Sequence, residues 1–196
     1  ELQRKPMMLL YAEPVSPLSS DRPGIRNFID FAKAGIPVLY APSNMAGSTA
    51  PVTIAGVTAL ANAESLAGFV LGQIANPGTP MVHGAGATAM DMRTGIYSYG
   101  GADHALCEMA FSQLSRYYNL PSWGFGGSTD SKTLDGQAYL EAAFRTLSSA
   151  MNGTNLIHDH GFIEFGTTFS LELLTACSEI IAMSSHLLKG VEVSED

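Results

Sequence analysis

The sequence predicts an α/β fold in which about five strand–helix units follow one another. Short apolar runs alternate five times with longer stretches of helical pattern, and 196 residues divided by five units gives roughly 39 residues for each. The apolar runs are continuous, which is typical of parallel strands covered by helices. The chain is 46% hydrophobic and only 14% charged, below the usual quarter, so we expect most of it to be buried.

Each predicted element has a local signal. We expect strands at Pro6–Tyr11, Pro37–Ala41, Pro80–Gly84, Ser122–Phe125 and Asn155–Asp159. We expect helices from the Asp21 cap to Gly35, from Pro51 to about Ala75, from Ala102 to Tyr118, from Asp135 to Met151 and from Phe169 to Leu188. Pro23 suits the first turn of the first helix. Ser48 or Thr49 is expected to cap the second, and residues 88–101 are expected to form a loop.

The number of units suggests an incomplete barrel. A closed (β/α)8 barrel needs eight units and typically about 250 residues. Five units form either an incomplete barrel or an open doubly wound sheet. Both ends of the chain look like cuts, which favours the barrel: residues 1–196 would be one partial TIM-barrel-like domain without a second domain. Its uncovered edges predict a homo-oligomer or a further segment.

Charge and cysteine content limit the partners. Ten Lys and Arg against eighteen Asp and Glu give a net charge of −8, and no basic run occurs. Nucleic acid and anionic membranes are therefore poor partners. No run reaches about 18 apolar residues, so we expect no membrane span. Cys107 and Cys177 lie in helical patterns without a CxxC motif, which predicts two reduced thiols in a cytoplasmic protein.

Residues 121–137, PSWGFGGSTDSKTLDGQ, are the most informative stretch. Gly124, Gly126 and Gly127 allow sharp bends and close approach of a ligand. The run Ser128–Lys132 then places five polar side chains after a strand, where ligands bind in α/β folds. The alternative is a helix N-terminus with surplus capping groups.

Other candidate side chains also follow the predicted strands. In a barrel the strand ends meet at one mouth, which would gather Glu13, Ser16, Ser43, Asn44, His83, Asp91, His158, Asp159 and His160. Aromatic residues cluster near the same mouth: Tyr97, Tyr99, Trp123, Phe125, Phe162 and Phe165. Aromatic faces attract quaternary ammonium groups. The alternative is that Trp123 and the Phe residues belong to an ordinary core.

His158-Asp159-His160 could hold a metal. Alternate residues of a strand point the same way, so both imidazoles could face one ion. Metal-dependent hydrolases use such a pattern. If the strand ends at Asp159, His160 instead lies in the loop. No third ligand is identified, and we assign no metal.

Five segments of the chain together resemble the trimethylamine methyltransferase family: GSTAPVTIAG, ANAESLAGFVLGQIANPGTP, DMRTGIYSYG, RYYNLPSWGFGGSTDSKTLDGQ and NGTNLIHDHGFIEFG. The resemblance runs in order through nearly the whole chain. Members are roughly twice this length or more and form a TIM barrel. The resemblance therefore implies that this chain is a fragment of a longer member.

The resemblance also implies a reaction. These enzymes transfer a methyl group from a tertiary or quaternary amine to the Co(I) corrinoid, a cobalamin, of a small partner protein, and hold no tightly bound cofactor themselves. Trimethylamine-specific members carry pyrrolysine in the glycine-rich loop, and alignment through residues 129–132 places that position at Ser128. The chain thus resembles the non-pyrrolysine branch, whose members demethylate quaternary amines such as glycine betaine.

A quaternary nitrogen is already a cation with a neutral leaving group, so its displacement needs position, dry surroundings and a cation-tolerant cage. For the substrate, we expect Tyr97, Tyr99 and Phe125 around the ammonium, Asp91 or Glu164 near the cation, and Thr129 and Lys132 on a substrate carboxylate. We expect Gly126, Gly127 and His158 to face the corrinoid. The expected catalytic groups are His158 and Ser128. The alternatives are a metal-dependent hydrolase using His158 and His160, or a non-catalytic fragment that binds betaines.

Overall fold

The computed structural model describes residues 4–194, so the extreme termini, whose cut-like appearance favoured the barrel, lie outside the described residues. The helices are α1 (Arg22–Lys33), α2 (Ile54–Ala75), α3 (Ala102–Tyr118), α4 (Gly136–Met151) and α5 (Leu171–Leu188). The strands are β1 (Leu10–Ala12), β2 (Val38–Tyr40), β3 (Ser43–Ala46), β4 (Met81–Val82), β5 (Gly86–Ala89), β6 (Trp123–Phe125), β7 (Leu156–His158), β8 (Phe162–Ile163) and β9 (Thr168–Phe169).

The main parallel strands lie side by side in the order in which they occur in the chain. β1 pairs with β2, β2 with β4, and β6 with β7. A parallel bridge between His83 and Ser122 joins β4 to β6, with hydrogen bonds from His83 N to Pro121 O (2.8 Å) and from Trp123 N to His83 O (2.9 Å). Right-handed crossovers that all advance in one direction place the connecting helices on one face.

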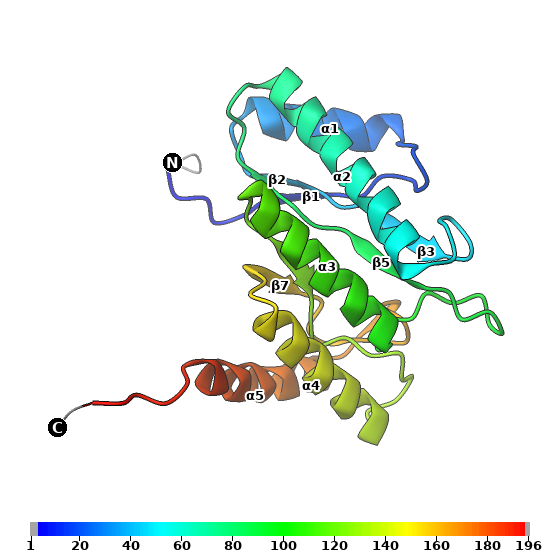
Figure 1. Cartoon of the computed structure of the whole chain (residues 1–196), viewed down its shortest axis with the longest axis vertical. Helices are drawn as coiled ribbons and strands as arrows, with labels where there is room; N and C mark the ends of the chain where they lie inside the picture. Colours follow the sequence, from blue (N-terminus) through cyan, green and yellow to red (C-terminus); the bar gives the residue numbers. More distant parts are fainter. Residues whose placement is uncertain (1–3, 195–196) are drawn as a thin grey trace.

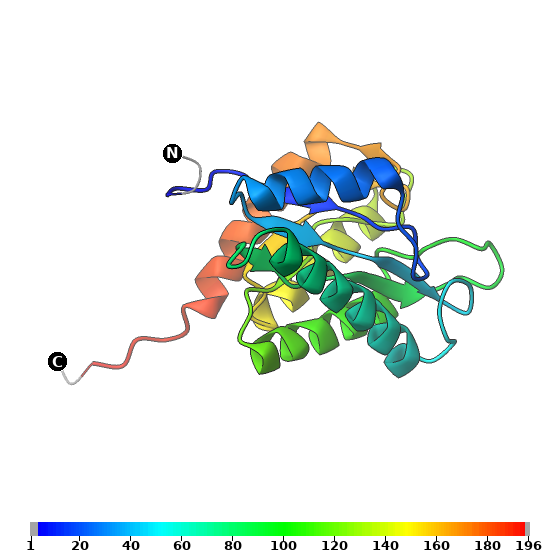
Figure 2. The same ribbon diagram turned by 90° about the horizontal axis from the view of Figure 1, so that it is seen from above.

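The helices form a continuous outer layer. Each one packs against the next along the chain, from α1 on α2 to α4 on α5 (Figure 1). β3 and β5 form a second parallel pair, which follows β2 and β4 in the chain and lies under α2 and α3. In Figure 2 the helices lie around the outside of the strands. The layer leaves the opposite face of the sheet free for a site.

The sheet is strongly curled. Tyr11 on β1 and Trp123 on β6 are three strands apart, which corresponds to about 14 Å on a flat sheet. Their ring centroids lie only 5.4 Å apart, and Tyr11 also lies 6.1 Å from the ring of His158 on β7. The sheets do not close, because no pairing within residues 4–194 joins β1 to β7. The predicted α/β class is confirmed, whereas the predicted partial TIM barrel is not: the strands of residues 4–194 form several small sheets and no closed barrel.

The long second helix begins later than expected. Its N-cap is Thr53, whose side chain accepts a hydrogen bond from Gly56 N at 3.1 Å. Thr49, one of the two expected caps, instead accepts from Met45 N at 2.9 Å. That hydroxyl therefore closes the turn after β3 and is not available to the helix, so the prediction of Ser48 or Thr49 as the cap was wrong.

Two strand pairs were not expected. Gly86–Ala89 was partly assigned to a loop, but it pairs with Ser43–Ala46 as β5 against β3. β8 and β9 form a short antiparallel hairpin between β7 and α5. Both pairs are only two to four residues long, and so short a run carries no periodic signal.

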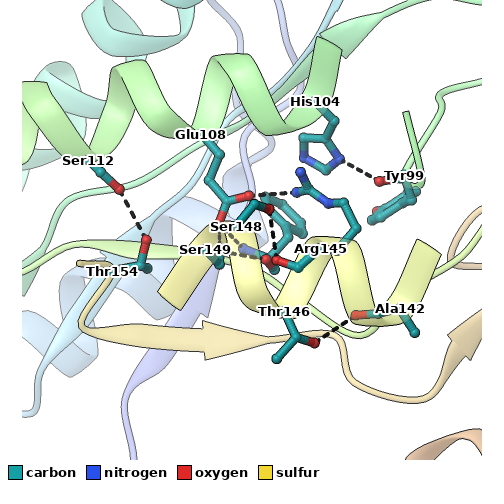
Figure 3. A network of polar contacts seen from close by, with 11 residues as sticks. Tyr99, His104, Glu108, Ser112, Ala142, Arg145, Thr146, Ser148, Ser149 and Thr154 are labelled. Carbon is teal, nitrogen blue, oxygen red and sulfur yellow. Dashed lines mark hydrogen bonds and ion pairs between the residues drawn. The ribbon is translucent and has the colours of Figure 1, made fainter. Parts of the chain in front are cut away.

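A buried ion pair joins α3 to α4 behind β6 (Figure 3). Arg145 Nη2 lies 2.6 Å from Glu108 Oε2, and the two side chains are 0% and 2% exposed. The Glu108 carboxylate also accepts from Phe125 N at 2.9 Å, and Ser149 Oγ donates to Phe125 O at 2.7 Å. Burial raises the pKa of Glu108, and Arg145 partly opposes this. Both backbone polar groups of Phe125 are thus held from the helix side.

His83 lies on the helix side of the sheet and not at the expected mouth. The side chain is fully buried. Its Nδ1 lies 2.7 Å from Ser115 Oγ on α3, and its Nε2 lies 3.0 Å from Asn62 Oδ1 on α2. Burial lowers the pKa of His83 to about 4. The imidazole therefore joins two helices to the sheet in its neutral form.

Two helices, α2 and α5, are long and apolar enough to cross a membrane by length and composition alone. The core helix of a folded domain can have the same length and composition. α2 packs against α1, α3 and three strands, as a core helix does. α5 contacts α4 and exposes several apolar side chains: Leu171, Leu174, Ile181, Met183, Leu187 and Leu188.

Replacing Gly124 with alanine is expected to destabilise the protein by about 2 kcal/mol, the usual cost of overpacking. A Cβ at Gly124 would collide with the Glu108 carboxylate, whereas a Cβ at Gly136 meets nothing within 4 Å. Gly136→Ala is therefore the matched control and should be neutral or slightly stabilising. Urea unfolding of both variants measures the difference. Equal stability of the two variants would contradict this account of Gly124.

Acidification is expected to weaken the fold through His83. The pKa of His83 is about 4 in the folded protein and about 6.5 in an unfolded chain. The unfolded chain binds more protons between these values, so this residue costs no stability above pH 6.5. Stability then falls by up to about 3 kcal/mol as the pH drops to 4. Unfolding curves at several pH values should show a shallower loss for His83→Gln, and an identical pH profile would argue against it.

Candidate functional site

The concave face of the curled sheet holds a pocket of about 570 Å³. It is lined by residues of β1, β6 and β7 and of the loops around them: Leu9, Tyr11, Glu13, Tyr99, Trp123, Phe125, Leu156, Ile157, His158, Asp159, Phe162 and Gly166. A concave, largely apolar cavity with a few polar groups is the usual form of a small-molecule site.

On β1 and β6, the alternation of side chains along the strand decides which residues line the pocket. Along and beyond β1, Tyr11 and Glu13 are two residues apart and both line the pocket, since alternate side chains of a strand share a face. On β6, Trp123 and Phe125 line the pocket, whereas Gly124 between them faces the Glu108 carboxylate. The site and the buried ion pair therefore lie on opposite faces of the same strand.

Aromatic rings form most of the pocket wall. Trp123 stacks on His158 with centroids 4.0 Å apart and planes 19° apart. Phe125 lies 4.7 Å from Trp123, 4.8 Å from His158 and 5.8 Å from Tyr99. Tyr11 completes the cluster at 5.4 Å from Trp123. Phe125 is thus the centre of an aromatic cluster, whose ring faces can attract a cation.

Two carboxylates accompany these rings. Tyr11 Oη donates to Glu13 Oε2 at 3.3 Å, and Asp159 Oδ1 lies 2.5 Å from His158 Nδ1. Burial raises the pKa of both the Tyr11 and the Tyr99 phenols, and the negative charges of Glu13 and Asp159 raise each further. Both acids therefore add negative charge beside the aromatic cluster.

The backbone of Asp159 is in an unusual conformation. Its φ is +70°, in the left-handed region that residues other than glycine rarely adopt. Successive strand residues normally point to opposite faces, which would direct the Asp159 carboxylate away from His158. The left-handed turn at the end of β7 brings the two side chains together. Strain of this kind is concentrated at functional sites.

Asp130 holds the Tyr99 loop against the end of β6. Its Oδ1 accepts from Tyr99 N at 2.6 Å, and its Oδ2 accepts from Ser98 Oγ at 2.5 Å. Glu141 on α4 in turn accepts from Asp130 N at 2.8 Å. The polar loop therefore positions one wall of the pocket.

The other members of that loop face the protein interior or solvent. Thr129 is buried and donates to Glu141 Oε2 at 2.6 Å. Ser128 is fully buried, and its hydroxyl has no partner within the described part of the chain. Lys132 is exposed and lies 3.9 Å from Glu164 Oε1. None of these three is among the residues that line the pocket.

The two histidines of the H-x-H pattern have different surroundings. A Cβ on Gly126 or Gly127 would meet the His160 ring, and His160 Nε2 lies 3.4 Å from Thr146 Oγ1 on α4. His158 lies in the pocket instead. Because β7 ends at His158, the strand rule does not reach His160, which contradicts the paired imidazoles of the metal alternative. No group of three metal-binding side chains occurs in residues 4–194.

Five further expected site residues lie outside the pocket lining. Asp91 is exposed and accepts from Arg93 N and Thr94 Oγ1 within its own turn. Glu164 has a φ of +52° and pairs with Lys132. Tyr97 packs on Tyr99, with ring centroids 5.1 Å apart. Gly126 and Gly127 are buried. Local loop geometry, which the sequence does not reveal, decides these positions.

The pocket brings together Tyr99, Phe125 and His158 from the expected set. Glu13, Trp123 and Asp159, which were expected at the mouth without an assigned role, also line the pocket, whereas Tyr11 was not predicted. The alternate positions of Tyr11 and Glu13 along the strand were a usable signal that both side chains lie on one face. The sequence carries no comparable signal for the left-handed turn at Asp159.

Comparison with known proteins agrees with the sequence pattern. A family model described as trimethylamine methyltransferase (MTTB) matches residues 1–196. The chain is 37% identical over 196 residues to a glycine betaine methyltransferase of Desulfitobacterium hafniense (strain Y51), covering 100% of this chain and 41% of that relative. It is 35% identical over 196 residues to trimethylamine methyltransferase MttB of Methanosarcina barkeri (strain Fusaro / DSM 804), covering 100% and 40%. The chain thus spans about 40% of the length of these relatives, and it belongs to the trimethylamine methyltransferase family.

Proposed function

We propose that the whole protein transfers a methyl group from a quaternary amine to the Co(I) corrinoid of a small partner protein. The observation that carries this proposal is the pocket of aromatic rings with Glu13 and Asp159 beside them. Relatives named for glycine betaine and for trimethylamine support a small methylated amine as the substrate. Ser128 at the position expected for pyrrolysine favours a quaternary amine over trimethylamine.

The reaction requires the protein mainly to bind the quaternary amine and to orient it. A quaternary nitrogen leaves as a neutral amine when its methyl carbon is attacked in line. The rings of Trp123, Phe125 and Tyr99 would bind the ammonium, because a desolvated cation over aromatic faces gains about 2 kcal/mol or more. Glu13 and Asp159 would add electrostatic attraction, and Asp159 would fix the orientation of the His158 ring through its Nδ1.

The methyl acceptor is a second substrate, brought by a partner protein. A pocket of about 570 Å³ fits a small amine in a site whose typical range is about 300–1,000 Å³. The corrinoid supplies the Co(I) nucleophile when its carrier is docked. His158 lies at the carboxyl end of β7 and is the residue that we propose to face it.

We also propose that residues 1–196 are part of one (β/α)8 barrel. The sequential strand order, the single helical layer and the curled sheet support this arrangement. A curled sheet with helices outside buries its concave face only when further strands complete it. Cys107 and Cys177 are buried free thiols, consistent with the cytoplasmic location that we propose.

The full-length protein is expected to methylate cob(I)alamin when it is given a quaternary amine. The assay follows the cobalt absorbance as methyl-Co(III) forms across a panel of quaternary amines, with trimethylamine as the comparison. Methylation by a quaternary amine and none by trimethylamine is the expected result. Amine binding without methylation would support the non-catalytic alternative and contradict the proposed reaction.

Replacing Tyr99 with leucine is expected to weaken amine binding about fivefold to thirtyfold, the equivalent of one cation–π contact. Tyr99→Phe keeps the ring and should keep most of the affinity. Tyr139→Leu is the matched control, because Tyr139 is exposed on α4 and lies outside the pocket lining. Calorimetric titration with the preferred amine measures all three variants. Unchanged affinity for Tyr99→Leu would exclude Tyr99 from the cage.

A further inference from the structure

We propose that the charges of the pocket select quaternary ammonium groups that carry no carboxylate. The inference rests on the proposed function and deepens it to the chemical class of the amine. The favoured substrates have a neutral or hydroxyl-bearing tail, for which choline and tetramethylammonium are the probes. A zwitterionic betaine of similar size is disfavoured.

Glu13 and Asp159 line the pocket, and none of the described residues that line it is Lys or Arg. His158 is the other titratable group able to carry positive charge there. Whether His158 is neutral or protonated, two carboxylates face at most one cation, so the described lining residues carry net negative charge.

Two basic residues on nearby elements, Arg145 and Lys132, lie beside acids outside the pocket. Arg145 is fully buried on the helix side and pairs with Glu108 at 2.6 Å. Lys132, expected to bind a substrate carboxylate, is exposed and lies 3.9 Å from Glu164. Thr129, its expected companion, donates its hydroxyl hydrogen bond to Glu141. Neither of these residues, which were expected to hold a carboxylate, is among the described residues that line the pocket.

Each acid contacts a neighbouring side chain of the pocket, and Glu13 is itself exposed. Tyr11 Oη donates to Glu13 at 3.3 Å, and the left-handed backbone at Asp159, with φ +70°, brings its carboxylate to His158. Burial and the two acids raise the pKa of Tyr11 and Tyr99. The negative field thus extends over the rings that would contact the ammonium.

This field acts oppositely on the two ends of a betaine. The ammonium is attracted, but a carboxylate a few ångströms away is repelled by acids of the same sign, and such like-charge contacts strongly disfavour the wrong ligand. A hydroxyl can instead donate a hydrogen bond to Glu13 or Asp159. We expect a preference of about tenfold or more for choline over glycine betaine.

Calorimetric titration of the full-length protein with tetramethylammonium, choline and glycine betaine tests the proposal. Wild type should bind choline about tenfold more tightly than glycine betaine. Glu13→Gln and Asp159→Asn should each reduce this ratio by weakening choline and strengthening betaine. Asparagine tolerates the left-handed conformation, so Asp159→Asn keeps the turn. Glu179→Gln, an exposed change on α5, should leave the ratio unchanged.

The outcomes separate this inference from the proposed function. Glycine betaine binding as tightly as choline, or a ratio that neither pocket variant changes, would overturn the charge selection and leave the methyltransferase proposal standing. Failure of all three amines to bind would overturn the proposed function itself. Tighter choline binding that both variants reduce, with Glu179→Gln unchanged, supports the inference.

Discussion

The buried carboxylate of Glu108 is the constraint on which much of this structure depends. It pairs with Arg145 on α4 and accepts from Phe125 N on β6, so one side chain of α3 connects two helices and a strand. Removing such a charge from water is costly unless every partner is in place. This constraint requires glycine at position 124, because any larger residue would occupy the space of the carboxylate. It also fixes the position of Phe125, whose backbone N–H donates to the same carboxylate.

The pocket is built directly on that arrangement. Phe125 is held through its backbone from the helix side, and its ring contacts Trp123, His158 and Tyr99 on the other face. Asp130 fixes the Tyr99 loop from the end of the same strand. Curling of the sheet then brings Tyr11 across to the cluster. A rigid, hydrogen-bonded scaffold beneath a set of rings is what a site needs when it binds by shape and charge.

The polar loop after β6 has a different role from the one its composition suggests. Five consecutive polar residues after a strand indicate a ligand-binding loop, and Asp130 does support a pocket wall. However, Thr129 donates a hydrogen bond to the Glu141 carboxylate on α4, and Lys132 is exposed to solvent. The pocket carboxylates come instead from the first and last main strands, through Glu13 and Asp159. The carboxylates that line the pocket therefore come from the two sheet edges and not from the glycine-rich loop.

The sequence by itself determined the α/β class, the positions of the five helices and the family. Continuous apolar runs, capping residues and glycine stops are local signals, and they placed α3 at Ala102–Tyr118 as found. The long motif matches likewise need no tertiary contact. Only the tertiary structure decided which side chains share a face. The late start of α2, the β3–β5 pair, the burial of His83 and the separation of His158 from His160 depend on non-local contacts or on one backbone dihedral. The pocket itself exists because curvature brings β1 near β6, and no local sequence pattern encodes that distance.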